Sequence, residues 1–149
     1  MLACMTTGSP ESALGRPRGP LNGLHVLVVD DDAGPRQLFR DVLEVAGARV
    51  TVAPSARLGL AAIQCEVPDV LVSDIMMPEH DGYWLIRSVR EVAAEHGGRV
   101  PALAITGDPN LHSRARALAE GFDAHLPKPL DLAALTGAIA RLARASRHR

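Results

Sequence analysis

Several features that would point to a membrane, nucleic-acid or zinc protein are missing from this sequence. No apolar run approaches the roughly 18 residues of a membrane-spanning helix, so we expect no membrane association. The net charge is only −1, which gives no general attraction to nucleic acid or to an anionic lipid surface. The only cysteines, Cys4 and Cys65, form no CxxC pair and no zinc-ligand spacing, and they imply no disulfide framework. These absences favour a cytoplasmic protein.

The length and composition predict one folded domain. With 149 residues, of which 47% are hydrophobic, the chain can bury a sizeable core. Residues 1–21 are rich in Gly, Pro and Ser and show no apolar periodicity, so we expect a disordered tail there. The domain is predicted over residues 22–145. A short basic end, residues 146–149, leaves no room for a DNA-binding or enzymatic output domain, which predicts a domain that acts by itself.

Five short apolar segments, each followed by an amphipathic one, predict parallel strands that alternate with helices. The strands are expected at Leu24–Val29, Arg49–Ala53, Val70–Val72 with Asp74 at its end, Ala102–Ile105 and Ala124–Leu126. The third helix is expected over Tyr83–Glu95, the fourth over Leu111–Glu120 and the last from near Asp131. This pattern is typical of a flavodoxin-like α/β fold, a doubly wound five-stranded parallel sheet in the order 2-1-3-4-5 with five helices.

The first two helices carry apolar residues at helical spacing, which predicts the faces that they bury. The face of the first helix consists of Leu38, Phe39, Val42, Leu43 and Ala46. The face of the second, which Ser55 would cap, consists of Leu58, Ala61, Ala62 and Cys65. We therefore expect Cys65 in the core rather than as a reactive thiol.

Polar residues follow four of the five predicted strands. Asp30 and Asp31 follow the first strand, Asp74 ends the third, and Thr106 and Lys128 follow the fourth and fifth. The order 2-1-3-4-5 puts the first and third strands side by side at the point where such sheets bind ligands. Taken alone, Asp74 is equally well explained as the cap of the following turn. The convergence of these polar groups on one rim favours a functional site.

The three carboxylates at this rim would repel one another unless a cation lay among them. Oxygen ligands without histidine or cysteine favour Mg²⁺ over zinc. Lys128 is the only lysine, beside fifteen arginines, and a compact, flexible ammonium is suited to a single phosphoryl or carboxylate oxygen. The group of residues is therefore suited to accept a phosphoryl group on Asp74, with Thr106 as a hydrogen-bond donor.

Four motifs in this order resemble the response-regulator receiver domain of two-component signalling. They are Val28–Asp32, Val72–Pro78 with Asp81 and Gly82, Ile105–Gly107 and Leu126–Pro129. The resemblance covers about residues 22–145, essentially all of the predicted fold. It implies that Asp74 is the phosphoryl acceptor and that Lys128 pairs first with Asp74 and then with the phosphoryl group. It also implies that Mg²⁺ is bound by Asp74, by Asp31 directly, by Asp30 through water and by the backbone carbonyl of Met76.

The resemblance further implies a switch and two positions that control access to the site. Thr106 would be the switch hydroxyl, while Met76 and Asp108 would tune the access of hydrolytic water. The family's usual aromatic switch residue, three positions before the lysine, is His125 here, which departs from the family pattern. Because burial favours the neutral imidazole, we expect partner binding to depend on pH, with the active face favoured at higher pH.

The resemblance implies that the chain is a stand-alone phosphoprotein of a phosphorelay and that its phosphorylation depends on Mg²⁺. The phosphoryl donor would be a histidine kinase or a histidine phosphotransfer protein. The output would be a protein-binding surface for an unknown downstream protein, or onward phosphoryl transfer, with no role for nucleic acid or membrane. Such a protein catalyses only its own phosphorylation and dephosphorylation and is not otherwise an enzyme. It would be a monomer, or a weak dimer through its fourth helix, fifth strand and fifth helix.

Two alternatives use the same residues differently. A small phosphatase of the haloacid-dehalogenase type would use Asp30 as its nucleophile, since the acidic run after the first strand loosely fits that motif. The chain has no room for the cap domain of such enzymes. A degenerate receiver would act as an unphosphorylated binding module, although every residue of the acceptor site is present.

Overall fold

The structure, a computed structural model, describes residues 19–147. Residues 1–18 and 148–149 lie outside the described residues, and with them most of the predicted tail and part of the predicted basic end. The strands are β1 (His25–Val29), β2 (Arg49–Ala53), β3 (Val70–Asp74), β4 (Ala102–Thr106) and β5 (Ala124–Pro127). The helices are α1 (Ala33–Val45), α2 (Ala56–Cys65), α3 (Gly82–Glu91), α4 (Arg114–Glu120) and α5 (Leu132–Arg147), with a short 3-10 helix η2 (Ala94–His96).

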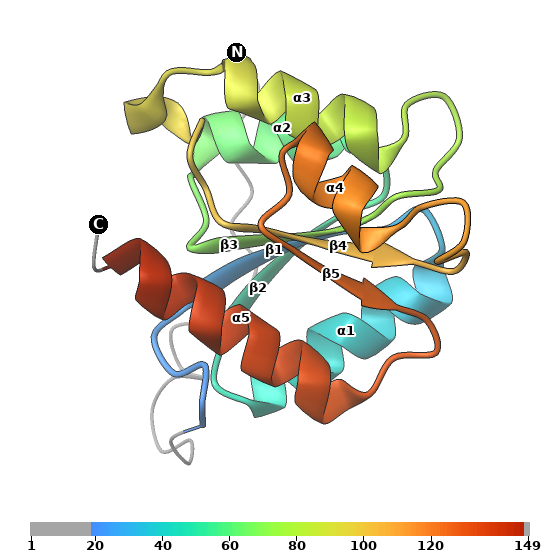
Figure 1. Cartoon of the computed structure of the whole chain (residues 1–149). Helices are drawn as coiled ribbons and strands as arrows, with labels where there is room; N and C mark the ends of the chain where they lie inside the picture. Colours follow the sequence, from blue (N-terminus) through green and yellow to red (C-terminus); the bar gives the residue numbers. More distant parts are fainter. Residues whose placement is uncertain (1–18, 148–149) are drawn as a thin grey trace.

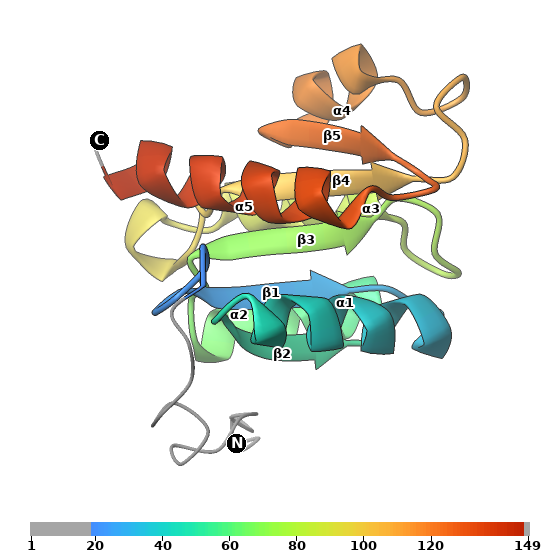
Figure 2. The same ribbon diagram turned by 90° about the horizontal axis from the view of Figure 1, so that it is seen from below.

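The sheet has the predicted topology. Its five strands are all parallel and lie in the order β2-β1-β3-β4-β5, which confirms the flavodoxin-like arrangement. Helices α1 and α5 cover one face, and α2, α3 and α4 cover the other (Figure 1, Figure 2). Both faces are therefore covered, and this explains why the three inner strands, β1, β3 and β4, are mainly apolar instead of alternating with polar residues.

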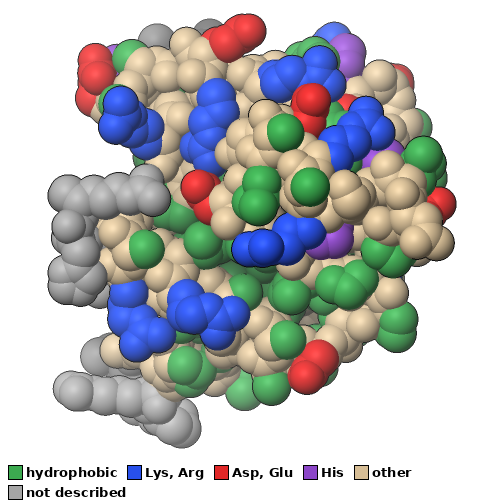
Figure 3. Space-filling model, viewed as in Figure 1, with side chains coloured by type: hydrophobic (Ala, Val, Ile, Leu, Met, Phe, Trp, Pro, Cys, Tyr) green, Lys and Arg blue, Asp and Glu red, His purple; other side chains and the backbone are tan. Residues whose placement is uncertain are grey.

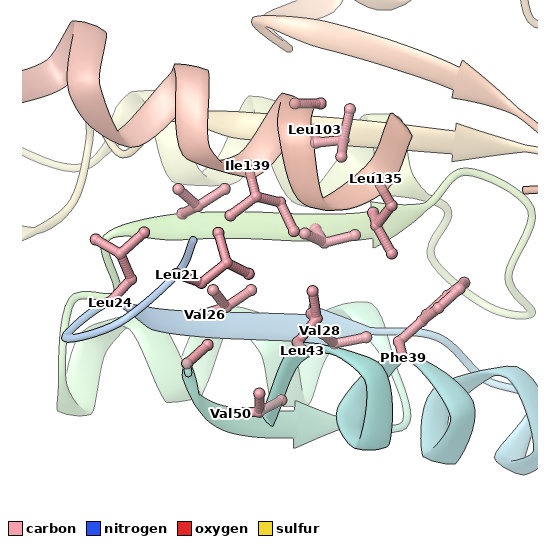
Figure 4. Close-up of a cluster of buried hydrophobic side chains, with 14 of the residues drawn as sticks. Leu21, Leu24, Val26, Val28, Phe39, Leu43, Val50, Leu103, Leu135 and Ile139 are labelled. Atoms are coloured by element: carbon pink, nitrogen blue, oxygen red, sulfur yellow. The ribbon is translucent and has the colours of Figure 1, made fainter. Parts of the chain in front are cut away.

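Two hydrophobic clusters, one on each face, hold the helices to the sheet. Successive side chains of a strand point to opposite faces, so Val26 and Val28 enter one cluster while Leu27 and Val29 enter the other. Figure 4 shows the first cluster, in which β1 packs between residues of α1 and α5. Leu21, which the sequence analysis assigned to the tail, is fully buried in this cluster, so the core begins before the predicted boundary.

The predicted inner faces of α1 and α2 are partly wrong. Phe39 and Leu43 are buried on α1, but Leu38 is 51% exposed. On α2 the buried residues are Ala56, Gly59 and Ile63, whereas Leu58 is 52% exposed. A side chain at Gly59 would place its Cβ 2.7 Å from a methyl group of Val29. The close approach of α2 to β1 thus selects small residues, which a search for large apolar ones does not find.

The expectation that Cys65 lies in the core is also wrong. Its side chain is exposed at the end of α2. The other cysteine, Cys4, lies outside the described residues.

The ends of α3 and α4 differ from the prediction because local hydrogen bonds decide them. Helix α3 stops at Glu91, and the next residues turn into η2 instead of continuing to Glu95. Helix α4 begins at Arg114 because the Ser113 hydroxyl accepts a hydrogen bond from the Arg116 backbone N–H, 3.1 Å away. Within the described range, no helix combines the length and the apolar character that a membrane span requires.

Arg90, near the end of α3, connects this helix to the segments that precede β4 and β5. Its guanidinium donates hydrogen bonds to the carbonyl oxygens of Gly121 (3.0 Å), Gly98 (3.1 Å) and Val100 (2.7 Å). It also pairs with the Asp123 carboxylate at 3.0 Å. One side chain thus satisfies three backbone carbonyls that lie between the helices and strands.

We expect Arg90→Ala to lower the free energy of unfolding by about 2–4 kcal/mol, because it removes several charge-assisted hydrogen bonds at once. Arg87→Ala is a matched control on the same helix. Arg87 is 61% exposed and pairs with Glu120, and such surface pairs contribute less than about 1 kcal/mol. Urea denaturation of both variants measures the difference. Equal losses of unfolding free energy in the two variants would show that Arg90 contributes no more than an exposed surface pair does.

Candidate functional site

The ends of four strands bring the predicted site residues to one edge of the sheet. Asp30 follows β1, Asp74 is the last residue of β3, Thr106 is the last residue of β4, and Lys128 follows β5. In the strand pairing, Val29 lies opposite Ser73, the residue before Asp74. The neighbouring strands therefore deliver their polar residues to the same level of the sheet.

Asp30, Asp31 and Asp74 form a carboxylate cluster. One oxygen from each of the three lies within 4.8 Å of the others. Asp30 is completely buried, Asp74 is nearly so, and Asp31 is exposed. The cluster thus combines two buried carboxylates, Asp30 and Asp74, with one that is exposed to solvent, Asp31.

The Asp30 carboxylate is only half satisfied by hydrogen bonds. Its Oδ1 accepts from the backbone N–H of Asp32 at 2.9 Å, but its buried Oδ2 has no partner among the described residues. Burial raises the pKa of Asp30, and the repulsion of Asp74 adds to this effect, while the Asp32 N–H opposes it. A buried carboxylate oxygen without a partner is costly, and a cation at this position would satisfy it.

Burial and neighbouring groups shift the pKa of Asp74 in opposite directions. Burial raises its pKa, while the Lys128 ammonium, 3.3 Å from Oδ2, and the backbone N–H of Met76 act to lower it. The Ser73 hydroxyl donates to the Asp74 carbonyl at 2.9 Å, so the strand end is fixed and the carboxylate stays available. The three carboxylates, with one unpartnered buried oxygen among them, fit a hard divalent cation such as Mg²⁺, which prefers oxygen ligands.

The loop from Ile75 to Asp81, which follows Asp74, is tightly folded. The Gly82 N–H donates to the Ile75 carbonyl at 2.8 Å and closes it. A Cβ at Gly82 would lie 2.5 Å from the Asp74 carbonyl oxygen, so only glycine allows this approach. Glu79 adopts a φ of 69°, which is uncommon outside glycine. Met76, on this loop and two residues after Asp74, is 54% exposed.

Thr106 and Asp108 are joined by local hydrogen bonds. The buried Thr106 hydroxyl accepts from the Asp108 backbone N–H at 3.1 Å. One oxygen of the Asp108 carboxylate accepts from the Leu111 N–H at 3.1 Å. Asp108 therefore stabilises the loop after β4 with one of its two carboxylate oxygens.

His125 already has a hydrogen-bond partner in this structure. Its Nε2 lies 3.0 Å from the carbonyl oxygen of His112, so this nitrogen is the donor. Burial lowers the pKa of His125, while the bond to His112 opposes this effect. His112 in turn contacts the Tyr83 hydroxyl through Nδ1, at 3.2 Å. Neither His112 nor Tyr83 was predicted as a site residue from the sequence, although the single tyrosine of the chain, when buried, needs a partner for its hydroxyl.

Known proteins resemble this chain in sequence. Residues 26–140 match the model of a family described as response regulator receiver domain. An uncharacterised 14.6 kDa protein of Leptolyngbya boryana is 46% identical over 108 residues, which cover 72% of this chain and 81% of that protein. The response regulator MprA of Mycolicibacterium vanbaalenii is 35% identical over 81% of this chain and 51% of that protein, so this chain spans about half the length of that relative.

The fold has counterparts among solved structures. The receiver domain of the sensor histidine kinase PA1611 from Pseudomonas aeruginosa is similar with a TM-score of 0.75 and 27% identity. The match covers 82% of this chain and 98% of that domain. That structure is described with a magnesium ion coordinated in its active-site cleft.

The burial of Asp30 predicts a measurable change in stability. Its pKa is raised in the folded state, so the folded protein binds the proton more tightly than the unfolded chain does. The charged carboxylate therefore destabilises the fold at neutral pH, and this destabilisation is lost as the pH falls through the folded-state pKa. We expect Asp30→Asn to raise the free energy of unfolding by about 1 kcal/mol in metal-free buffer at pH 7.

The gain should shrink in acid, where wild-type Asp30 is also neutral. Asp31→Asn is the matched control, because the Asp31 side chain is exposed and should change the stability by less than about 0.5 kcal/mol. Denaturation curves at several pH values measure both variants. A less stable Asp30→Asn protein at pH 7 would contradict the prediction.

Proposed function

We propose a function for this chain from the fact that it belongs to the response regulator receiver domain family. In this proposal, Asp74 accepts a phosphoryl group and the phosphorylated domain passes on a signal. The observation that carries it is the position of Asp74, which ends β3 between the Lys128 ammonium and the carboxylates of Asp30 and Asp31. Lys128 offsets part of the negative charge around this oxygen nucleophile, and the two other acids would hold a cation that offsets the rest.

The phosphoryl donor in this proposal is a phosphohistidine of a histidine kinase or of a histidine phosphotransfer protein. An Asp74 carboxylate oxygen attacks the phosphorus and forms an acyl phosphate. The P–N bond breaks, its electron pair stays on the imidazole nitrogen, and the imidazole is left neutral once solvent supplies a proton. Positioning and charge neutralisation are the main contributions that a protein can make to this reaction.

Each neighbour of Asp74 has a proposed role that its position supports. Lys128 pairs with the Asp74 carboxylate before the transfer and with a phosphoryl oxygen after it. The Thr106 hydroxyl donates to another phosphoryl oxygen. Asp31 holds Mg²⁺ directly and Asp30 holds it through water, together with Asp74 and the Met76 carbonyl. When bound, the metal supplies positive charge that offsets both the acids and the incoming phosphoryl group.

The proposed output surface consists of α4, β5 and α5. Figure 3 shows hydrophobic and basic side chains next to one another over this face. Leu118 on α4 and Leu132 on α5 are among its partly exposed hydrophobic residues, which suits a protein partner. We propose binding to a downstream protein, onward phosphoryl transfer, or a weak dimer through this face, with the domain acting in the cytoplasm. The phosphatase alternative belongs to a different family, so the match to the receiver family argues against it.

We expect Asp74→Asn to abolish phosphoryl incorporation, because an amide cannot act as the nucleophile. Acetyl phosphate serves as the donor, with wild type labelled only when Mg²⁺ is present. Asp41→Asn is the matched control, since Asp41 is an exposed acid on α1 whose carboxylate accepts from Gln37, and it should be labelled as fully as wild type. Undiminished labelling of Asp74→Asn would refute the acceptor assignment.

The acyl phosphate should hydrolyse faster in a Met76→Asn variant than in wild type, by several-fold. Met76 is apolar and exposed beside the acid cluster, so it cannot orient a hydrolytic water as an amide can. The decay of labelled protein after removal of acetyl phosphate measures the rate. Val45→Asn, a change at an exposed residue of α1, controls for added polarity. Equal or faster decay in wild type would show that Asp108 or another group controls the water.

A further inference from the structure

A buried polar pair, Tyr83 and His112, lies outside the acid cluster and has no role in the proposed chemistry. Tyr83 is on α3 and is fully buried, and its hydroxyl lies 3.2 Å from Nδ1 of His112. The two rings meet edge to face, with centroids 5.5 Å apart. The guanidinium carbon of Arg116, on α4, lies 4.5 Å from the centre of the Tyr83 ring. The pair thus joins α3 to the segment that leads into α4.

His112 belongs to the loop of residues 107–113, which begins directly after Thr106. Its backbone N–H donates to the Asp108 carbonyl at 2.9 Å, and its own carbonyl accepts from Nε2 of His125 on β5. Asp108 is also the residue whose N–H donates to the Thr106 hydroxyl. A continuous set of hydrogen bonds therefore runs from Thr106 through the loop to α3 and to β5.

A pocket on the active-site side of this loop leaves room for it to move. The pocket has a volume of about 430 Å³. It lies between His112 and the loop that follows Asp74 and is lined by Ile75, Met76, Met77, Pro78, Asp81 and His112. Close-packed side chains resist displacement, whereas this pocket offers His112 space for a shift toward the loop after Asp74. On its other sides, His112 forms hydrogen bonds with Asp108, Tyr83 and His125.

We propose that Tyr83 and His112 are positioning residues for Thr106. Together with His125, they hold the loop of residues 107–113 in its resting arrangement, and the loop moves into the pocket only when the contact between Tyr83 and His112 breaks. This inference rests on the proposed function, because Thr106 acts on a phosphoryl group that Asp74 has accepted. A contact made in only one of two arrangements shifts their equilibrium by its own free energy. The contact therefore opposes phosphoryl acceptance.

Tyr83→Phe tests this directly, because it keeps the buried ring and removes only the hydroxyl. We expect the variant to accept the phosphoryl group of acetyl phosphate about two- to tenfold faster than wild type, the factor that corresponds to one hydrogen bond. Its Mg²⁺ affinity should not change, since the carboxylates are untouched. A residue with a purely structural role would lower the unfolding midpoint without accelerating this reaction.

Thr51→Val is the matched control. It also removes a hydroxyl that bonds a histidine, since Thr51 Oγ1 lies 2.8 Å from Nε2 of His25. These residues belong to β2 and β1, and His25 begins its strand at the edge of the sheet opposite to Asp74. Thr51→Val should lower the stability without changing the rate of phosphoryl acceptance.

A double-mutant cycle with His112→Leu makes the test independent of any one variant. If the two residues act through one contact, the double variant accepts the phosphoryl group at the same rate as either single variant. A double variant whose acceleration equals the product of the two single accelerations would overturn the proposal. A Tyr83→Phe rate equal to or below that of wild type would also overturn it. If Tyr83→Phe does not fold, the rate of His112→Leu alone decides in the same way.

A failure of the proposed function would look different. In that case wild type would not be labelled by acetyl phosphate at all, and amide hydrogen exchange would test the restraint by itself. Exchange at residues 107–113 should then be faster in Tyr83→Phe than in wild type and unchanged in Thr51→Val. Equal exchange in the two variants would overturn the inference.

Discussion

The mutual repulsion of buried carboxylates is the constraint on which the site depends. Asp30 follows β1 and Asp74 ends β3, and these adjacent strands belong to a sheet that is covered on both faces, so the fold places the two acids close together. Burial raises the pKa of both groups, and one oxygen of Asp30 has no partner within the described part of the chain. The fold therefore holds together charges that become favourable only when positive charge joins them, and Lys128 supplies one part of it.

The edge of the sheet where the strands begin and the edge where they end contain different polar contacts. At the edge where the strands begin, Arg90 satisfies three backbone carbonyls. At the opposite edge, Asp30 keeps an unsatisfied oxygen and Glu79 has an uncommon backbone conformation. Unfavourable features of this kind persist only where the surrounding structure enforces them, and they concentrate at functional sites. The two apolar clusters on either side of the sheet provide that enforcement.

The sequence predicted the sheet order and the grouping of the site residues because both follow from short-range patterns. Strands buried on both faces are continuous apolar runs, and a carboxylate that ends such a run, like Asp74, must lie at the sheet edge. The inner face of α2 was not predictable in this way, because Gly59 faces the core through close backbone approach rather than through size. The contact of Tyr83 with His112 was missed because it joins two elements whose relative position only the tertiary structure fixes.

The identity of the phosphorylated residue is the most direct measure of what this site does. Treatment with acetyl phosphate and Mg²⁺, reduction of the acyl phosphate with borohydride and mass spectrometry of the peptides would locate it. Modification of Asp74 alone is the result expected from its position beside Lys128 and the other two acids. Modification of Asp30 would instead support a phosphatase-like nucleophile after β1. A protein that carries no modification would be a binding module that works without phosphorylation.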